Sequence, residues 1–156
     1  MSAGKEIVDQ LRRHKGQAAP VEASATGDRT RVRVRAQQVE EIGARLDEVE
    51  AESPPLGPGG AERWAREFAE RARYLLEPLE VIEVDQQENE AIARSNPPDR
   101  SGDAIDYYEA HVSGTGRAVV RRYRYDRQKR TRQQAPMDLS HEQIRRLVDD
   151  IDASRP

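Results

Sequence analysis

The chain has 156 residues, of which 35% are charged and 35% hydrophobic, and its net charge is −3. This length allows at most one compact domain with extensions. Because the sequence contains no cysteine, disulfide bonds, thiolate zinc sites and cysteine nucleophiles are excluded. No apolar run approaches the roughly 20 residues of a membrane-spanning helix, and the N-terminus lacks the apolar segment of a signal peptide. We therefore expect a cytoplasmic protein without membrane contact.

The first predicted element is a short helix over residues 5–15, followed by a flexible tether of small residues. Ile7, Val8 and Leu11 lie on one side of this helix. Three apolar residues cannot form a core alone, so the helix is a candidate docking peptide, and the alternative is a frayed terminus. We expect residues 1–29 to form this N-terminal helix and tether.

A second amphipathic helix is predicted between residues 30 and 52. Val32, Val39, Ile42, Leu46 and Val49 fall on one helical stripe, and positions 40–52 are strongly acidic. The helix could associate with another copy as a short coiled coil, or it could lie on its own domain. The prolines and glycines of SPPLGPGG then form a linker, so residues 30–60 make up a second segment.

Residues 61–156 are predicted to form a globular domain with a helix, four strands and a closing helix. The first helix, at 61–77, carries Trp64 and Phe68 toward the core. The closing helix, at 140–151, begins with a capping box of Ser140 and Gln143. The predicted strands lie at 79–85, 91–95, 104–112 and 117–125, with a loop at 96–103. The fold class is therefore α+β: a four-stranded antiparallel meander packed by helices, with an N-terminal helical extension.

The hairpin around Gly114-Thr115-Gly116 has a predictable register. A three-residue loop with Gly116 in the left-handed position sets residues whose numbers sum to 230 opposite one another. The pairs that follow are Asp106 with Arg124, Tyr107 with Tyr123, Tyr108 with Arg122, and Glu109 with Arg121. Because a shift by one residue destroys this agreement, we expect Arg121 and Arg124 to be ion-paired within the sheet.

The most unusual feature of the sequence is a basic segment over residues 117–132. Seven arginines and Lys129 face a single acid there, which gives about +7, so the remaining residues carry about −10 of the total of −3. Such a separation indicates an acidic partner: a nucleic acid, another protein, or the chain's own acidic segment. The candidate binding residues, those left without a partner in the hairpin, are Arg117, Arg127, Lys129, Arg130 and Arg132.

No catalytic or metal-binding motif stands out. The three histidines are far apart, and Arg145 occupies the place of the second histidine in a zinc-protease pattern that begins at His141. An enzyme would need a concave pocket that gathers His111, Glu109 or Tyr107. We therefore expect no cofactor, no metal and no enzymatic activity.

The sequence thus predicts a non-enzymatic interaction protein: a small adaptor, scaffold or assembly component with charge-complementary surfaces. Its expected partner is an acidic protein surface or a second copy of the chain. The alternative is binding of RNA or single-stranded DNA through residues 117–132, which predicts exposed Tyr123 and Tyr125 side chains beside the arginines.

Overall fold

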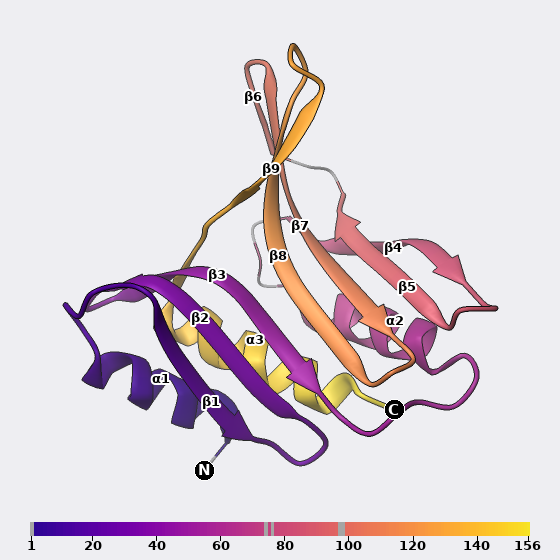
Figure 1. Cartoon of the computed structure of the whole chain (residues 1–156), viewed down its shortest axis with the longest axis horizontal. Helices are drawn as coiled ribbons and strands as arrows, with labels where there is room; N and C mark the ends of the chain where they lie inside the picture. The colour runs from indigo at the N-terminus through magenta and orange to yellow at the C-terminus, as the bar shows by residue number, and fades with distance from the viewer. Residues whose placement is uncertain (1, 74, 76, 97–98) are drawn as a thin grey trace.

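The computed structural model describes residues 2–73, 75, 77–96 and 99–156, and Figure 1 shows its elements. Within these residues the chain forms three helices and one antiparallel sheet, an α+β fold. The helices are α1 (Ala3–Arg13), α2 (Gly60–Arg71) and α3 (His141–Ser154). The strands are β1 (Val21–Thr26), β2 (Arg31–Val39), β3 (Gly43–Glu52), β4 (Leu79–Asp85), β5 (Glu90–Ser95), β6 (Asp99–Ser101), β7 (Ala104–Ser113), β8 (Arg117–Asp126), β9 (Thr131–Ala135) and β10 (Met137–Ser140).

The sheet is larger than the predicted four-stranded meander. Its main path runs β1-β2-β3-β8-β7-β5-β4, and β10, β6 and β9 pair with β3, β7 and β8, respectively. The four expected strands are present as β4, β5, β7 and β8, with ends close to those predicted. Positions 1, 74, 76 and 97–98 lie outside the described residues. They belong to the predicted N-terminal segment, to the helix predicted at 61–77 and to the loop predicted at 96–103, respectively.

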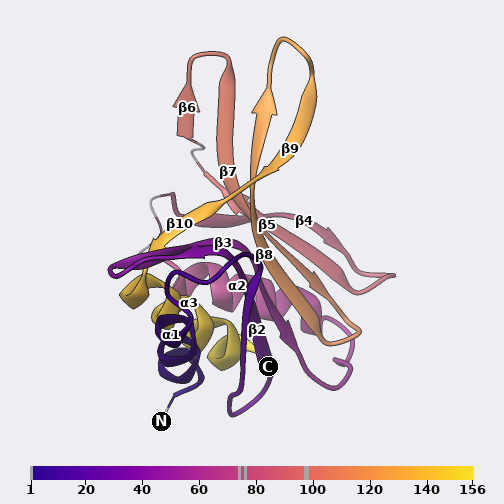
Figure 2. The ribbon, with the colours of Figure 1, turned by 60° about the vertical axis from the view of Figure 1, so that its left-hand side comes forward.

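Two central strands change neighbours along their length. The second half of β3 pairs with β8, whereas its first half pairs with β10. In the same way, β8 pairs with β3 through its first half and with β9 through its second half. Residues 99–106 and 122–135 therefore leave the body of the sheet as a projecting structure, which we call the arm (Figures 1 and 2).

All three helices cover one face of the sheet (Figures 1 and 2). A single cross-strand row points toward them and is at most 2% exposed. This buried row is Ala23, Val34, Val49, Val120, Ala110 and Ala93. The next row points to the opposite face, which no helix of the described residues covers and which we call the open face. It consists of Ser24, Arg33, Glu50, Val119, His111 and Ile92. Side chains alternate between the two faces because successive residues of a strand point in opposite directions.

The helix predicted over residues 30–52 is wrong, because this segment forms β2 and β3. The sequence from Arg31 to Arg35 alternates arginine and valine, which is the two-residue period of a half-buried strand. Val32 and Val34 are fully buried on the helix side of the sheet. Ile42 belonged to the proposed helical stripe, but it lies in the β2–β3 turn and is 83% exposed.

The N-terminal helix is part of the core. Ile7 and Leu11 are fully buried and Val8 is nearly so, because α1 packs against α3 and β1. The expected tether contains β1, which pairs with β2. The apolar face of α1 is therefore occupied within the chain, and the three residues proposed for docking are not on the surface.

Two carboxylates of α3 hold the N-terminal elements in place. Asp149 accepts a hydrogen bond from the Gly4 backbone amide at 2.8 Å. Asp152 accepts hydrogen bonds from the backbone amides of residues 28–30 and from the Thr30 hydroxyl, at 2.7 to 3.1 Å. Core residues from the first 29 positions, from positions 30–60 and from the remainder belong to one hydrophobic cluster.

The predicted register of the β7–β8 hairpin is confirmed in every pair, and the capping box at Ser140 is present. Gly116 has φ +99°, and a Cβ there would lie 2.2 Å from the Ser53 carbonyl oxygen.

We expect Gly116→Ala to lower the free energy of unfolding by at least about 1–2 kcal/mol, because alanine is strained in this conformation. Urea denaturation measures the change. Gly57→Ala is the control, since Gly57 faces open space, and an equal effect of both would contradict the explanation.

Candidate functional site

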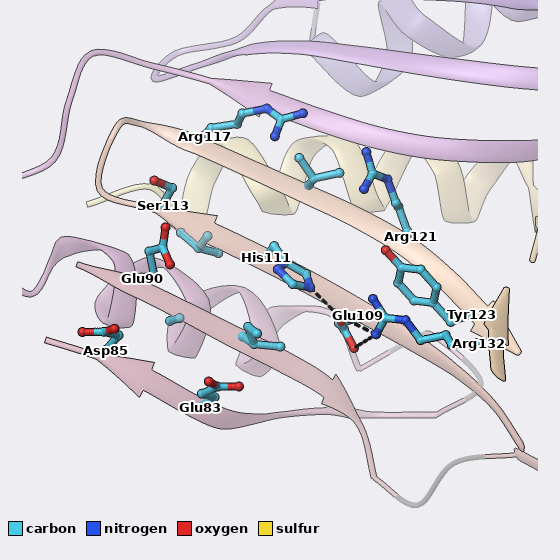
Figure 3. A pocket seen from close by; sticks show the side chains of 14 residues that line it. Glu83, Asp85, Glu90, Glu109, His111, Ser113, Arg117, Arg121, Tyr123 and Arg132 are labelled. Carbon is cyan, nitrogen blue, oxygen red and sulfur yellow. Dashed lines mark hydrogen bonds and ion pairs between the residues drawn. The ribbon is translucent and has the colours of Figure 1, made fainter. Parts of the chain in front are cut away.

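The open face contains a hollow of about 430 Å³ along β4, β5, β7 and β8 (Figure 3). Ile92, His111 and Val119 lie side by side across three of these strands and line it. On the β8 side, the hollow is bordered by Arg117 and Arg121. On the side of β4 and β5, it is bordered by the carboxylates of Glu83, Asp85 and Glu90. The two borders therefore carry opposite charge.

Glu109 is the buried charged group of this hollow, with only 1% of its side chain exposed. It accepts hydrogen bonds from Arg94 Nε at 2.9 Å and Arg132 Nη1 at 3.2 Å, and it pairs with His111 Nε2. Arg94 lies over the Tyr107 ring and Arg132 over the Tyr123 ring, with guanidinium carbons 5.1 Å and 3.7 Å from the ring centroids. The carboxylate is thus held by three nitrogen-bearing side chains.

Burial on its own raises the pKa of Glu109. The hydrogen bonds from His111 and Arg94, together with the charges of Arg94 and Arg132, outweigh burial and lower this pKa from 4.5 to about 2. Glu109 is therefore ionised at neutral pH, where it stabilises the cations around it and cannot donate a proton.

His111 meets part of the requirement that we set for an enzyme, since it lines a concave hollow together with Glu109. Ser113 is the next residue of β7 on the same face, but its hydroxyl accepts from Thr115 rather than from His111. Among the hydrogen bonds of the described residues, none joins His111 to a hydroxyl group. The arrangement holds the imidazole of His111 against the carboxylate of Glu109.

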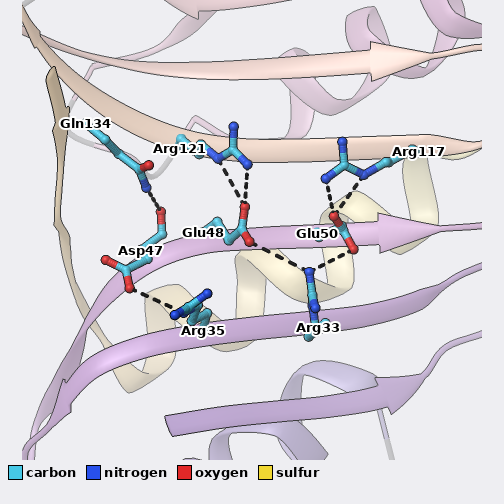
Figure 4. Close-up of polar contacts among 8 residues, drawn as sticks. All are labelled: Arg33, Arg35, Asp47, Glu48, Glu50, Arg117, Arg121 and Gln134. Carbon is cyan, nitrogen blue, oxygen red and sulfur yellow. Dashed lines mark hydrogen bonds and ion pairs between the residues drawn. The ribbon is translucent and has the colours of Figure 1, made fainter. Parts of the chain in front are cut away.

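A second network lies next to the hollow and joins β2, β3 and β8 (Figure 4). Glu50 binds Arg33 at 3.1 Å and Arg117 Nε at 2.8 Å. Glu48 binds Arg121 at 2.8 Å. Two carboxylates of the acidic segment therefore neutralise two arginines of the basic segment across neighbouring strands. Arg121 stands opposite Glu109 in the register, as predicted, but its side chain pairs with Glu48.

Further arginines of the basic segment are also paired. Arg122 binds Glu77 at 2.9 Å and lies 4.4 Å over the Tyr108 ring, and Arg124 binds Asp106 at 2.8 Å. With Arg117, Arg121 and Arg132, five of the eight cations of residues 117–132 have acidic partners. The predicted pairing of Arg124 within the sheet is confirmed. Of the five candidate binding residues, Arg117 and Arg132 lie in these networks.

The other three candidates, Arg127, Lys129 and Arg130, are exposed in the turn between β8 and β9 at the end of the arm. We call them the basic tip. Within the part of the chain that the structure describes, their side chains form no ion pair. The turn is ordered by its backbone: the Arg127 amide donates to the Asp103 carbonyl at 2.9 Å, and the Lys129 amide donates to the Asp126 carboxylate at 3.1 Å.

The tyrosines of the arm lie away from the helix-covered core. Tyr123 and Tyr125 are half-buried and do not belong to the main hydrophobic cluster. Tyr123 borders the hollow on the open face, with its ring centroid 5.9 Å from that of Tyr107. One face of the Tyr123 ring is covered by Arg132.

The sequence named the chain's own acidic segment as a possible partner, but sequence reasoning missed that Glu48 and Glu50 are the residues that pair, and that Arg33 joins the same network. The alternation in RVRVR and in EVEAE was the available signal, because it places these charged side chains on one face of two strands. Among the described residues, no group of three or more histidine, aspartate and glutamate side chains is arranged to hold a metal ion. In the same residues, no helix has both the length and the apolar character needed to cross a membrane.

Comparison with known proteins found no family model, no curated protein and no solved structure that matches this chain. Its function is therefore argued from the geometry and charges of its own residues.

Proposed function

We propose that the chain is a non-enzymatic interaction protein, a small adaptor, scaffold or assembly component, that contacts an acidic protein surface through its basic tip. The observation that carries the proposal is the position of Arg127, Lys129 and Arg130. They belong to the turn between β8 and β9, which lies at the end of an arm that projects from the body (Figure 2). Their side chains are exposed and have no acidic partners among the described residues. A cytoplasmic location, expected from the sequence, is part of this proposal.

The internal ion pairs support the choice of the tip over the rest of the basic segment. Arginines that already bind Glu48, Glu50 or Glu109 are held by those carboxylates. An incoming acidic surface would have to replace these contacts. The tip cations are exposed instead, so they attract an acidic partner from a distance and orient it during the encounter.

A second candidate is binding of RNA or single-stranded DNA. It is favoured by one observation, the Tyr123 ring on the open face beside Arg132 and Arg121, since bases stack on aromatic rings and phosphates bind arginine. Against it, Glu83, Asp85 and Glu90 border the same hollow and repel phosphate groups. We therefore place an acidic protein surface first.

The test uses a fluorescein-labelled decaglutamate peptide, a ten-nucleotide uridine RNA, and the matching single-stranded DNA. Fluorescence anisotropy measures their binding to the full chain at low and moderate salt. We expect the peptide to bind, and the triple variant Arg127→Glu, Lys129→Glu, Arg130→Glu to bind at least roughly tenfold more weakly, because three attractions become repulsions.

The control variant reverses three exposed cations of α1, through Lys5→Glu, Arg12→Glu and Arg13→Glu. It changes the net charge equally and is expected to bind the peptide like the original chain. If both variants bound the peptide equally weakly, the loss of binding would come from the change in net charge and not from the tip, and this result would overturn the proposal. Tighter binding of the oligonucleotides, lost in Tyr123→Ala, would favour the second candidate.

A further inference from the structure

A strongly acidic surface lies on the β4–β5 hairpin. Residues 79–93 contain no lysine or arginine, and five carboxylates occupy this stretch: Glu80, Glu83, Asp85, Glu88 and Glu90. We call them the acidic hairpin, and all five residues are exposed. None of them has an ion pair with another described residue. Glu80 accepts a hydrogen bond from Asn96, and Asp85 accepts one from the Glu88 backbone amide at 3.1 Å.

The acidic hairpin and the basic tip each lie beside an open edge of the sheet. Among the described residues, β4 pairs only with β5, and β9 pairs only with β8. Edge strands present backbone amide and carbonyl groups to an incoming strand. The β4 edge also carries Ile82, which is 46% exposed at an irregularity in the pairing with β5. A partner can therefore add backbone hydrogen bonds and an apolar contact to the attraction between charges.

We propose that the acidic partner is a second copy of the chain, with the basic tip of each copy bound to the acidic hairpin of the other. This inference rests on the proposed function, because it names the partner of the same tip. In each copy, the basic tip and the acidic hairpin are surfaces of opposite charge that form no ion pair among the described residues. Two copies related by a twofold axis satisfy all four surfaces, and the assembly closes as a dimer.

The charges also explain why the same edges do not pair with themselves. Two acidic hairpins repel each other, as do two basic tips, so only the unlike combination is attractive. Because the interaction joins exposed charges, it weakens as salt screens them over a distance of about 10 Å at 0.1 M ionic strength.

Two variants with opposite changes test this arrangement. The tip-reversed variant carries Arg127→Glu, Lys129→Glu and Arg130→Glu. The hairpin-reversed variant carries Glu83→Lys, Glu88→Lys and Glu90→Lys, and it keeps Asp85 because that carboxylate holds the turn. Each variant alone has two surfaces of the same sign and is expected to be monomeric. In an equimolar mixture, both contacts regain opposite charge, so a heterodimer is expected.

Light scattering after size-exclusion chromatography measures the mass, and circular dichroism verifies that each variant is folded. The original chain is expected at twice its monomer mass of 17.7 kDa in about 25 mM salt and as a monomer in about 500 mM salt. The control variant of α1 should remain dimeric. A mixture that stays monomeric, a single variant that stays dimeric, or a mass that rises with concentration without a plateau overturns the inference.

The decaglutamate experiment separates this inference from the function on which it rests. A chain that is monomeric at every salt concentration but binds decaglutamate through its tip refutes the dimer and leaves the interaction function standing. A chain whose tip binds neither the peptide nor a second copy refutes both.

Discussion

Glu109→Gln is expected to lower the free energy of unfolding at neutral pH by about 2–3 kcal/mol, because the amide removes the buried counter-charge of Arg94 and Arg132, which keep part of their contact with water. The pKa of Glu109, about 2 in the fold against an ordinary 4.5, corresponds to a contribution of similar size. Urea denaturation at neutral pH measures the loss. Glu83→Gln is the matched control, since Glu83 borders the same hollow without an ion pair among the described residues.

The same substitution has a signature in the pH dependence. Since the pKa of Glu109 is lower in the folded chain, its stabilisation is complete above pH 4.5 and is lost as pH falls from about 4.5 to 2. The difference in unfolding free energy between the original chain and Glu109→Gln should therefore shrink across this range. A difference that stays constant from pH 7 to pH 3 would show that the carboxylate is not held ionised by its neighbours.

Leu11→Ala is expected to lower the free energy of unfolding by about 2–5 kcal/mol, because Leu11 is fully buried between α1 and the rest of the fold. Thermal and urea denaturation of the full chain measure the change. Ile42→Ala is the control, since Ile42 is 83% exposed, and it should change stability by less than about 0.5 kcal/mol. If α1 were a docking peptide with a free apolar face, Leu11→Ala would leave stability unchanged.

The structure of the second half of the chain was easier to predict from the sequence, because its turns, strand pairs and helix cap form between residues that are close in the sequence. The β7–β8 register follows from a three-residue turn and from pairs such as Asp106 with Arg124, and no two partners are more than 22 positions apart. The capping box at Ser140 likewise spans only three residues. Short-range turn and cap chemistry is visible in the sequence, since the interacting groups are neighbours along the chain.

In the first half of the chain, the prediction was wrong for residues 30–52, where the sequence fits both the helical period of 3.6 residues and the strand period of two residues. Between Arg31 and Glu52, residues such as Val39, Leu46 and Val49 fit the spacing of a helical stripe. The strict alternation of RVRVR instead fits a strand, and the structure shows that the strand pattern is the correct one. The burial of Leu11 was not visible either, because α1 packs against β1 and against α3, and α3 begins more than 120 positions later. β9 (TRQQA) has no apolar alternation that would predict a strand, and the alternation of Met137 and Leu139 in β10 covers only four residues.

The sequence predicted a basic binding surface, but it did not predict which cations of that surface are free of ion pairs. The sequence identified the basic segment and named its own acidic residues as one possible partner. Which arginines are neutralised depends on β3 lying beside β8, and Glu50 and Arg117 are 67 positions apart. This neighbourhood pairs Arg117 and Arg121. The other paired arginines bind Glu77, Asp106 and Glu109, so the three cations of the basic tip remain without an ion pair among the described residues.

The change of neighbours along β8 has a mechanical consequence. β7 and β8 run without interruption from the body into the arm, and their inner halves carry part of the buried core. Two continuous paired strands therefore anchor the arm in the centre of the sheet. The turn at its tip is folded before a partner arrives, because its own backbone hydrogen bonds order it. Binding at the tip does not have to order the backbone first, so little of the attraction is spent on conformational entropy. A force on the tip is transmitted directly to the strands that carry Glu109 and its arginines.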